Sequence, residues 1–375
     1  MKVGTILHGF AVQRVRELDE LQAKLWEMEH IKSGAQLCWL ERADENKAFS
    51  IAFKTLPEDS TGVFHILEHS VLAGSGKYPV TSPFLQLLKS SMASFLNAMT
   101  FPDKTVYPFA TPNETDFKNL MDVYLNAVFC PLAMVDKGVF EQEGWHRDED
   151  GTVSGVVYNE MQGALATPDA QLQNALSRAM FPDTAYGFVS GGDPEAIPTL
   201  TYEAFTAAHK RFYHPSNAYL LLDGSIDLSR CLALLDSYLS RFTAIFPDTD
   251  IRPQTPVCPP RETIEYPLPA GEPAETRWKL GQGYVIGTSQ DTQTLFAAQV
   301  LCDVLCGSNH APLCRAVLET GLAEDVTLSC DDECLQPMLL LQVQNFRRDD
   351  LPAIVTRAVL DAAQSEGFSL RDRDV

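Results

Sequence analysis

The sequence predicts an α+β protein made of α/β sandwich domains, in which mostly antiparallel sheets are flanked by helices. We expect two homologous domains, the second of them incomplete. Three observations lead to this prediction. Strand-like and helical patterns alternate through both halves of the chain. A segment with five prolines, residues 246–262, separates the halves. The chain also stops soon after a new helical pattern begins, within residues 351–375.

The proline-rich segment sets the expected domain limits. Proline stiffens a linker and cannot join the interior of a sheet, so domains meet at such a segment. We therefore expect a first domain over residues 1–246, a linker over 247–261 and a structurally related, truncated domain over 262–375. A length of 375 residues suits two domains of ordinary size.

Local patterns predict the elements of the first half in order. Residues 15–30 have an amphipathic pattern typical of a helix, and residues 113–132 have another, with Asn113 as its N-cap. Further helices are expected at residues 63–72, 82–92 and 155–166, and strands at residues 35–41, 47–55 and 217–227. Residues 93–110 are expected to be extended, with a turn at Pro102 and Asp103. In the second half, strands are expected at residues 281–289 and 335–346, and helices at residues 292–306 and 311–321.

Composition excludes several classes of partner. The net charge is −21, with 50 acidic and 29 basic residues, which argues against nucleic acid and against an anionic membrane surface. No run of about 18 apolar residues is present to span a membrane. Nine cysteines with no secretory signal indicate reduced thiols. We expect a cytoplasmic protein, or one of an organellar matrix if a transit peptide has been removed.

One short stretch carries chemistry. His65 and His69 are four residues apart, so on a helix they lie one turn apart on the same side and can present two imidazoles to one metal ion. Glu68 is placed to reach a metal-bound water without being a ligand. This H-x-x-E-H order is the reverse of H-E-x-x-H. Because the rest of the helix is apolar, its polar residues need partners, and a metal satisfies them.

A catalytic zinc site takes three protein ligands and a water, so a third ligand must come from elsewhere. Spacing alone leaves Glu141, Glu143 and Glu160 open as candidates, with His146 as a further one. Glu160 is a lone acid in an apolar helical pattern. Glu141 and Glu143 lie at the edge of an acidic run, which favours capping or surface roles for both.

Six stretches together resemble the pitrilysin/insulinase class of inverted-motif zinc metallopeptidases, especially its presequence protease branch. They are HILEHSVLAGSGKYP, SFLNAMTFPDKTVYPFA, QEGWH, GVVYNEMQGA, SGGDPEAIPTLTYEAF and YHPSNAYLLLDGS, and they cover much of residues 1–230 in the family's order. The resemblance implies Zn²⁺ held by His65, His69 and Glu160, with Glu68 as general base. It also implies substrate contacts at Asn97 and at its neighbours Phe95 and Ala98, on an edge strand that pairs with an extended peptide.

The resemblance further implies a zinc-dependent endopeptidase of unfolded peptides. In the family, four related domains form two halves around a chamber, and the second half supplies an arginine and a tyrosine near the scissile carbonyl. We therefore expect this chain to need a C-terminal half, in the same polypeptide or as a partner subunit, and alone it is expected to lack full activity. The alternative is a non-catalytic, peptide-binding scaffold half of a larger assembly.

Overall fold

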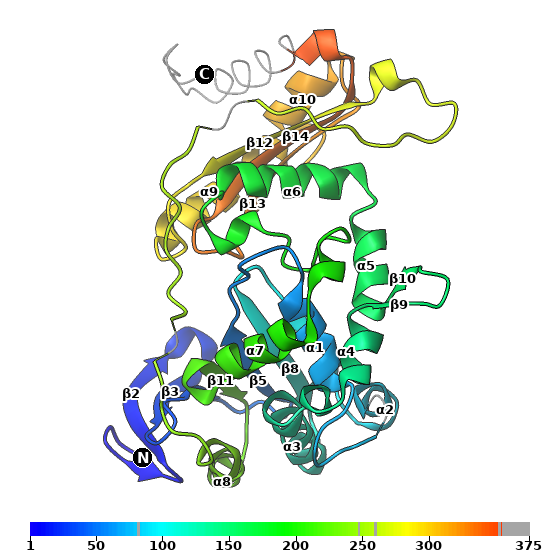
Figure 1. The fold of residues 1–375 in the computed structure, drawn as a ribbon. Helices are drawn as coiled ribbons and strands as arrows, with labels where there is room; N and C mark the ends of the chain where they lie inside the picture. Colours follow the sequence, from blue (N-terminus) through cyan, green and yellow to red (C-terminus); the bar gives the residue numbers. More distant parts are fainter. Residues whose placement is uncertain (81–82, 247, 259–260, 352–353, 355–375) are drawn as a thin grey trace. The chain divides into compact units, whose positions relative to one another are not determined.

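A computed structural model describes the chain except residues 81–82, 247, 259–260, 352–353 and 355–375. The chain forms two compact units (Figure 1). Unit 1 contains Met1–Ala164 and Phe188–Asp250, and unit 2 contains Leu165–Gly187 and the chain from Ile251 onward. Each unit has its own sheet, and the mixed fold with mainly antiparallel sheets confirms the predicted fold class.

Nine of the described strands form the sheet of unit 1, in the order β1-β2-β3-β4-β11-β5-β8-β6, with β7 also paired to β8. All neighbours are antiparallel except β11 and β4, which are parallel. The strands are β1 (Ile6–Leu7), β2 (Phe10–Leu18), β3 (Ala23–His30), β4 (Gln36–Glu41), β5 (Lys47–Lys54), β6 (Phe95–Leu96), β7 (Met99–Thr100), β8 (Lys104–Thr111) and β11 (Ala218–Asp223). A separate hairpin pairs β9 (His146–Arg147) with β10 (Val153–Ser154).

The helix predicted for residues 15–30 is wrong, because these residues belong to the hairpin of β2 and β3. A left-handed residue, Gln22 with φ of 49°, closes the turn between the strands. Arg14 and Arg16 both pair with Glu27 across the hairpin. The charges that resemble one face of a helix therefore form cross-strand pairs on the exposed side of a sheet.

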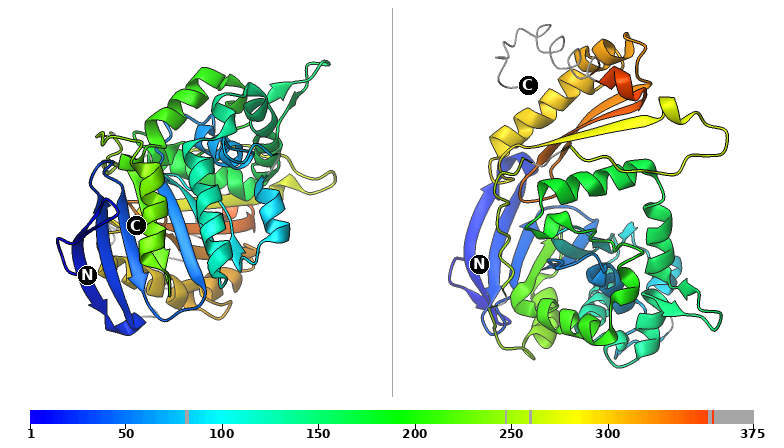
Figure 2. Two further views of the ribbon diagram at one scale, coloured as in Figure 1. Left: turned by 90° about the horizontal axis from the view of Figure 1, so that it is seen from below. Right: turned by 45° about the horizontal axis from the view of Figure 1, so that its top comes forward.

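Helices cover one face of the sheet of unit 1 (Figures 1 and 2). They are α1 (Val63–Leu72), α2 (Pro83–Ser90), α3 (Glu114–Phe129), α4 (Lys137–Glu143), α5 (Val156–Ala164), α7 (Tyr202–Phe212) and α8 (Leu228–Leu239). Phe109 of β8 packs against Phe117 and Tyr124 of α3, and all three rings are buried. As predicted, the side chain of Asn113 caps α3 by accepting a hydrogen bond from the amide of Asp116. Helix α1 packs against both α3 and β8.

Unit 2 has a three-stranded antiparallel sheet in the order β12-β14-β13. The strands are β12 (Trp278–Val285), β13 (Asp325–Asp331) and β14 (Met338–Phe346), and the helices are α6 (Pro168–Met180), α9 (Thr292–Cys306) and α10 (Pro312–Leu318). Buried Leu313, Val317 and Val343 belong to its core. The helices and strands predicted between residues 281 and 346 are confirmed to within four residues at each end, whereas β13 was not predicted. The helical pattern after Leu351 lies mainly outside the described residues.

Helix α6 comes from the middle of the chain but belongs to unit 2, so the chain passes between the units at residues 164–165, 187–188 and 250–251. The expected first domain, 1–246, includes residues 165–187, whereas in the structure these residues belong to unit 2. The last of these passages lies inside the proline-rich segment 247–261. The functional domain limits stay a prediction.

Two glycines explain how α6 lies against β12. A methyl group added at Gly281 would lie 2.7 Å from Leu176 Cδ1 and 3.0 Å from Leu172 Cγ. One added at Gly283 would lie 2.2 Å from the sulfur of Met180. Residues two apart on a strand face the same side, so the pair forms a flat surface that accepts the large apolar side chains of α6.

Gly281→Ala should therefore destabilise unit 2 by about 1–3 kcal/mol, because the added methyl group overpacks a close contact. Chemical denaturation of the purified protein measures this. The matched control is Gly163→Ala in α5, where an added methyl group meets nothing within 4 Å. Alanine favours a helix there, so we expect a gain of about 0.5–1 kcal/mol. Equal effects of the two substitutions would contradict the packing argument.

A buried histidine ties α7 to α3. Nε2 of His209 donates to the carbonyl of Val128 at 2.9 Å, and the ring stacks on Tyr213 with centroids 5.0 Å apart. Burial lowers the pKa of His209 to about 4, since it removes water from the charged form, although the bond to Val128 acts in the opposite direction. The imidazole is therefore neutral in the folded protein at neutral pH.

This depressed pKa makes stability depend on pH. Between pH 6.5 and 4 the unfolded chain binds more protons at this site than the folded chain, so the contribution is complete above pH 6.5 and is lost on acidification. The difference between about 4 and 6.5 corresponds to about 3 kcal/mol. His209→Gln keeps an N–H donor but does not titrate, so its stability should fall less over this range. Denaturation at several pH values measures the free energy of unfolding of both proteins. If it falls equally in the parent protein and in His209→Gln, His209 is not the source of the pH dependence.

Candidate metal centre

Helix α1 is buried along most of its length. Seven of its ten residues are buried, His65 and Glu68 among them. It follows Gly62, which has a φ of 67° and lies against the loop at Gly191 and Gly192. A side chain at Gly62 would come within 2.6 Å of the Gly191 carbonyl oxygen. Only glycine accepts both this backbone conformation and this close approach, which brings the loop to His65.

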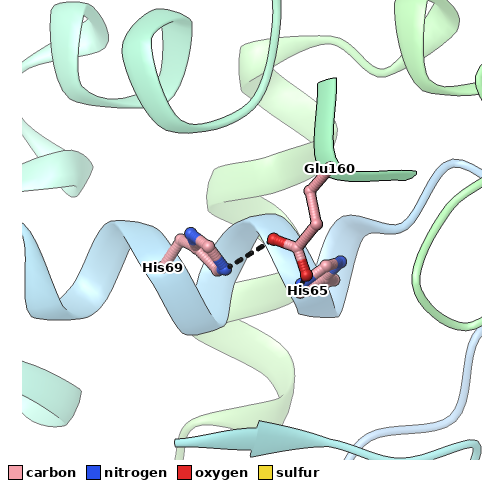
Figure 3. Close-up of side chains that lie close together, drawn as sticks. All are labelled: His65, His69 and Glu160. Atoms are coloured by element: carbon pink, nitrogen blue, oxygen red, sulfur yellow. Dashed lines mark ion pairs between the residues drawn. The ribbon is translucent and has the colours of Figure 1, made fainter. Parts of the chain in front are cut away.

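The histidines of α1 and a glutamate of α5 meet at one point (Figure 3). Nε2 of His65 lies 3.7 Å from Glu160 Oε1, and Nε2 of His69 lies 3.5 Å from Glu160 Oε2. One ligand atom from each residue falls within 4.8 Å of the others. Among the described residues this is the one group of three or more histidine, cysteine or acidic side chains close enough to hold a metal ion.

The ring of His65 is oriented by the backbone. Its Nδ1 lies 2.9 Å from the carbonyl oxygen of Gly191. A carbonyl can only accept, so Nδ1 carries the proton and Nε2 keeps its lone pair toward Glu160. Metal-binding histidines usually have such an outer partner, which fixes tautomer and ring orientation. A methyl group at Gly191 would lie 2.7 Å from the sulfur of Met161, so a larger residue there would displace this flexible side chain.

His69 has a carboxylate as its outer partner. Glu143 Oε2 lies 3.6 Å from Nδ1 of His69, and Gln142 Nε2 donates to Glu143 Oε1 at 2.9 Å. The expectation of a surface or capping role for Glu143 is wrong, because its side chain is only 11% exposed. The burial of Glu143 was not predicted, because the residue lies at the edge of an acidic run in the sequence. The signal available was the helical spacing of Phe140 and Glu143, which places the acid on the buried face of α4.

The carboxylates around His69 favour positive charge. Burial alone lowers the pKa of His69, but the bond to Glu143 and the charges of Glu68, Glu160 and Glu143 outweigh it, so the pKa is raised. The same arrangement of carboxylates attracts a cation. The site therefore combines two imidazole nitrogens with a surplus of negative charge.

The other candidate ligands do not join this group. Glu141 is 43% exposed and pairs with Lys137 one turn earlier in α4, which agrees with a surface role. His146 lies in β9, where its Nδ1 contacts the carbonyl oxygen of Glu141 at 2.8 Å and its Nε2 faces Asp148. Its position beyond the end of α4 makes it a local structural residue.

Glu68 is buried on the same helix, and the residue is 8% exposed. Thr100 Oγ1 donates to Glu68 Oε2 at 2.6 Å. Thr100 belongs to β7, which lies at one end of the sheet through its pairing with β8. Sequence reasoning did not single out Thr100, because only the tertiary fold brings this strand beside α1.

The expected substrate residues lie along the same end of the sheet. Phe95 is in β6 and is 47% exposed, whereas Asn97 and Ala98 lie between β6 and β7. The carbonyl oxygen of Asn97 accepts a hydrogen bond from Tyr124 Oη at 3.2 Å, and its amide donates to Pro108. The extended segment expected over residues 93–110 thus contains three strands, β6, β7 and β8, with a break at Asn97 and Ala98. Their role in binding substrate stays a prediction.

Two models of known families match this chain. Residues 56–187 match the family described as "Insulinase (Peptidase family M16)", and residues 199–366 match "Peptidase M16 inactive domain". The first range contains His65, Glu68, His69 and Glu160. This chain belongs to the M16 peptidase family, of the pitrilysin/insulinase type.

Several curated proteins are similar over almost the whole chain. It is 41% identical to Protein HypA of Clostridium perfringens over 351 residues, covering 92% of this chain and 36% of that protein. It is 39% identical to presequence protease 1, chloroplastic/mitochondrial, of Arabidopsis thaliana over 374 residues, covering 96% and 34%. The mitochondrial presequence protease of Danio rerio is 34% identical, with 98% and 37% covered. The chain spans about a third of the length of these relatives.

Solved structures show the same fold. Pitrilysin superposes with a TM-score of 0.65 at 16% identity, covering 96% of this chain and 38% of that one. A putative M16-like peptidase from Alicyclobacillus acidocaldarius gives a TM-score of 0.64 at 17% identity, covering 94% and 82%. At these identities the likeness concerns the fold alone.

The contact between His69 and Glu143 leads to a testable prediction. Glu143→Gln keeps the shape of the side chain but removes its charge, so His69 becomes a weaker ligand. We expect the affinity for Zn²⁺ to fall about 10- to 100-fold, as for other outer partners of metal ligands. Competition with a chromophoric chelator measures it.

The matched control for this prediction is Glu141→Gln on the same helix. Glu141 is exposed and pairs with Lys137, so its loss should leave the affinity for Zn²⁺ unchanged. If both variants bind Zn²⁺ as tightly as the parent protein, Glu143 has no influence on the site.

Proposed function

We propose that this chain is the catalytic portion of a zinc-dependent endopeptidase that hydrolyses unfolded peptides. The observation that supports this most is the convergence of His65, His69 and Glu160 on one point, with buried Glu68 on the same helix. Membership of the M16 peptidase family adds support, since its description is that of a peptidase.

The donor set fits Zn²⁺. Two neutral imidazole nitrogens and one carboxylate are a ligand set of catalytic zinc sites, which leave a further position open for water. Glu160 is 52% exposed, so the site is open on one side. The outer partners also fit, because Gly191 and Glu143 each face the second ring nitrogen of a histidine.

Bound zinc would supply a Lewis acid that polarises the scissile carbonyl and lowers the pKa of water. In this proposal Glu68 accepts the proton of the attacking water and later delivers it to the leaving amine. Its burial favours this role, because few water molecules compete for the carboxylate. Glu160 contributes a negative charge that balances the metal.

The end of the sheet at β6 and β7 is the proposed peptide site. An extended peptide can add as a further strand at a sheet edge, and main-chain hydrogen bonds then bind it with little dependence on sequence. Phe95, Asn97 and Ala98 are proposed to contact it. This mode favours unfolded peptides, because a folded protein does not offer a free extended segment.

The whole protein is proposed to need more than this chain. The relatives are about three times as long, and their remaining length is proposed to correspond to a C-terminal half, in the same polypeptide or as a partner subunit. We propose that residues 1–246 are catalytic, 247–261 link the domains, and 262–375 belong to a related domain. Alone, this chain is expected to bind zinc but to cleave peptides weakly.

A second candidate function is a non-catalytic, peptide-binding scaffold. The description "inactive domain" for residues 199–366 favours it for that part of the chain. The intact set of Glu68, His65, His69 and Glu160 favours catalysis for the first part. A complete protein that binds zinc and peptide without turnover would support the scaffold.

Compartment does not decide between these functions. Among the described residues, the helices fall short of the length and apolarity needed to cross a bilayer. Relatives named as mitochondrial or chloroplastic and a bacterial relative are similarly close in sequence. The expected cytoplasmic location, with an organellar matrix as the alternative, stays a prediction.

Substitutions separate metal binding from proton transfer. In the full-length protein, Glu68→Gln should keep zinc but lose cleavage of an unstructured peptide, by about 10²-fold or more. His69→Ala should lose both, because it removes a ligand. Metal content by mass spectrometry and a fluorogenic peptide assay measure these outcomes. Full activity of Glu68→Gln would refute the assignment of the base.

A further inference from the structure

A hydrogen bond joins the proposed peptide-binding strand to the proposed general base. Oγ1 of Thr100 donates to Oε2 of Glu68 at 2.6 Å. Such a short contact between a hydroxyl and a carboxylate is typical of a charge-assisted hydrogen bond. Within the part of the chain that the structure describes, Thr100 is the residue whose side chain donates to Glu68.

The donor is held rigidly. Thr100 pairs with Thr105 of β8, and the amide of Phe101 donates to the carbonyl of Lys104 at 2.8 Å, so the turn after β7 is closed. Thr105 Oγ1 contacts Thr55 Oγ1 at 2.8 Å and is fully buried. A β-branched side chain on a fixed backbone has few rotamers, so the hydroxyl of Thr100 keeps one direction.

A hydroxyl that engages one carboxylate oxygen has a specific consequence. Oε2 of Glu68 is occupied, which restrains rotation of the carboxylate and leaves Oε1 to accept a proton. The water that reacts needs a base in a defined place, because misplacement by about 1 Å can cost about 10²-fold in rate. Thr100 is therefore suited to orient the base rather than to touch the substrate.

We propose that Thr100 is a positioning residue, which holds the Glu68 carboxylate in the orientation that accepts the proton of the attacking water. This inference rests on the proposed peptidase function. Because Thr100 also belongs to the strand at the proposed peptide site, the bond fixes the distance between the peptide and its general base. A merely structural threonine would stabilise β7 without affecting the chemical step.

Thr100→Val and Thr100→Ser test the inference in the full-length, zinc-loaded protein. Valine keeps the shape and β-branching but cannot donate, so kcat should fall about 10- to 100-fold. KM should change by less than about threefold, because peptide binding is not altered. Serine keeps the hydroxyl and should restore kcat to within about threefold of the parent. Zinc content should be the same in all of these proteins.

The matched control is Thr327→Val. Thr327 is an exposed threonine on strand β13, so the same loss of a hydroxyl should leave kcat unchanged. A readout independent of activity comes from thermal unfolding of Thr100→Val alone and combined with Glu68→Ala. Thr100→Val should lower Tm more when Glu68 is present, because only then does a buried carboxylate lose its donor.

The outcomes separate the two proposals. Parent-like kcat in Thr100→Val, or equal losses in the valine and serine variants, overturns the positioning role while the peptidase function stands. The same holds if the Tm effect of Thr100→Val is independent of Glu68. A full-length parent protein that holds zinc but cleaves no peptide overturns the proposed function and the positioning role together.

Discussion

Burial of α1 imposes the constraint on which the architecture of unit 1 depends. An unpaired buried polar group costs about 1–3 kcal/mol, so a helix packed on nearly all sides favours partners for its polar side chains. In α1 the buried hydroxyl of Ser70 has no hydrogen-bond partner among the described residues. His65, Glu68 and His69 each face a partner from a different element. The loop at Gly191 serves His65, β7 serves Glu68 through Thr100, and α4 serves His69 through Glu143. The buried helix thus requires three neighbours in fixed places.

These partners explain features of the chain far from the motif. Gly62 lacks a side chain because the loop at Gly191 and Gly192 approaches the start of α1 more closely than a Cβ allows. The aromatic layer of β8 and α3 holds the sheet that carries Thr100. Packing therefore sets the geometry of the polar site. The polar site in turn limits which residues can occupy the positions that contact it.

The sequence allowed prediction of whatever depends on spacing along one element. The pairing of His65 with His69 follows from helix periodicity, and the Asn113 cap follows from its position before an amphipathic run. The hairpin at residues 15–30 was missed because charges at strand spacing mimic a helix when their partners, such as Glu27 for Arg14, lie on another strand. Glu143 and Thr100 were missed for the related reason that their importance arises only from which distant side chain they meet.

The two histidines are held by unequal partners, and this bears on how the site distributes charge. Gly191 offers His65 a neutral carbonyl, which orients the ring but adds no net charge, whereas Glu143 offers His69 a full negative charge. The raised pKa of His69 reflects this, together with the charges of Glu68 and Glu160. A ligand paired with a carboxylate is a stronger electron donor than one paired with an amide. At the proposed metal site, His69 is therefore the side at which a bound cation would be most strongly neutralised, and it is adjacent in sequence to Glu68, the proposed base.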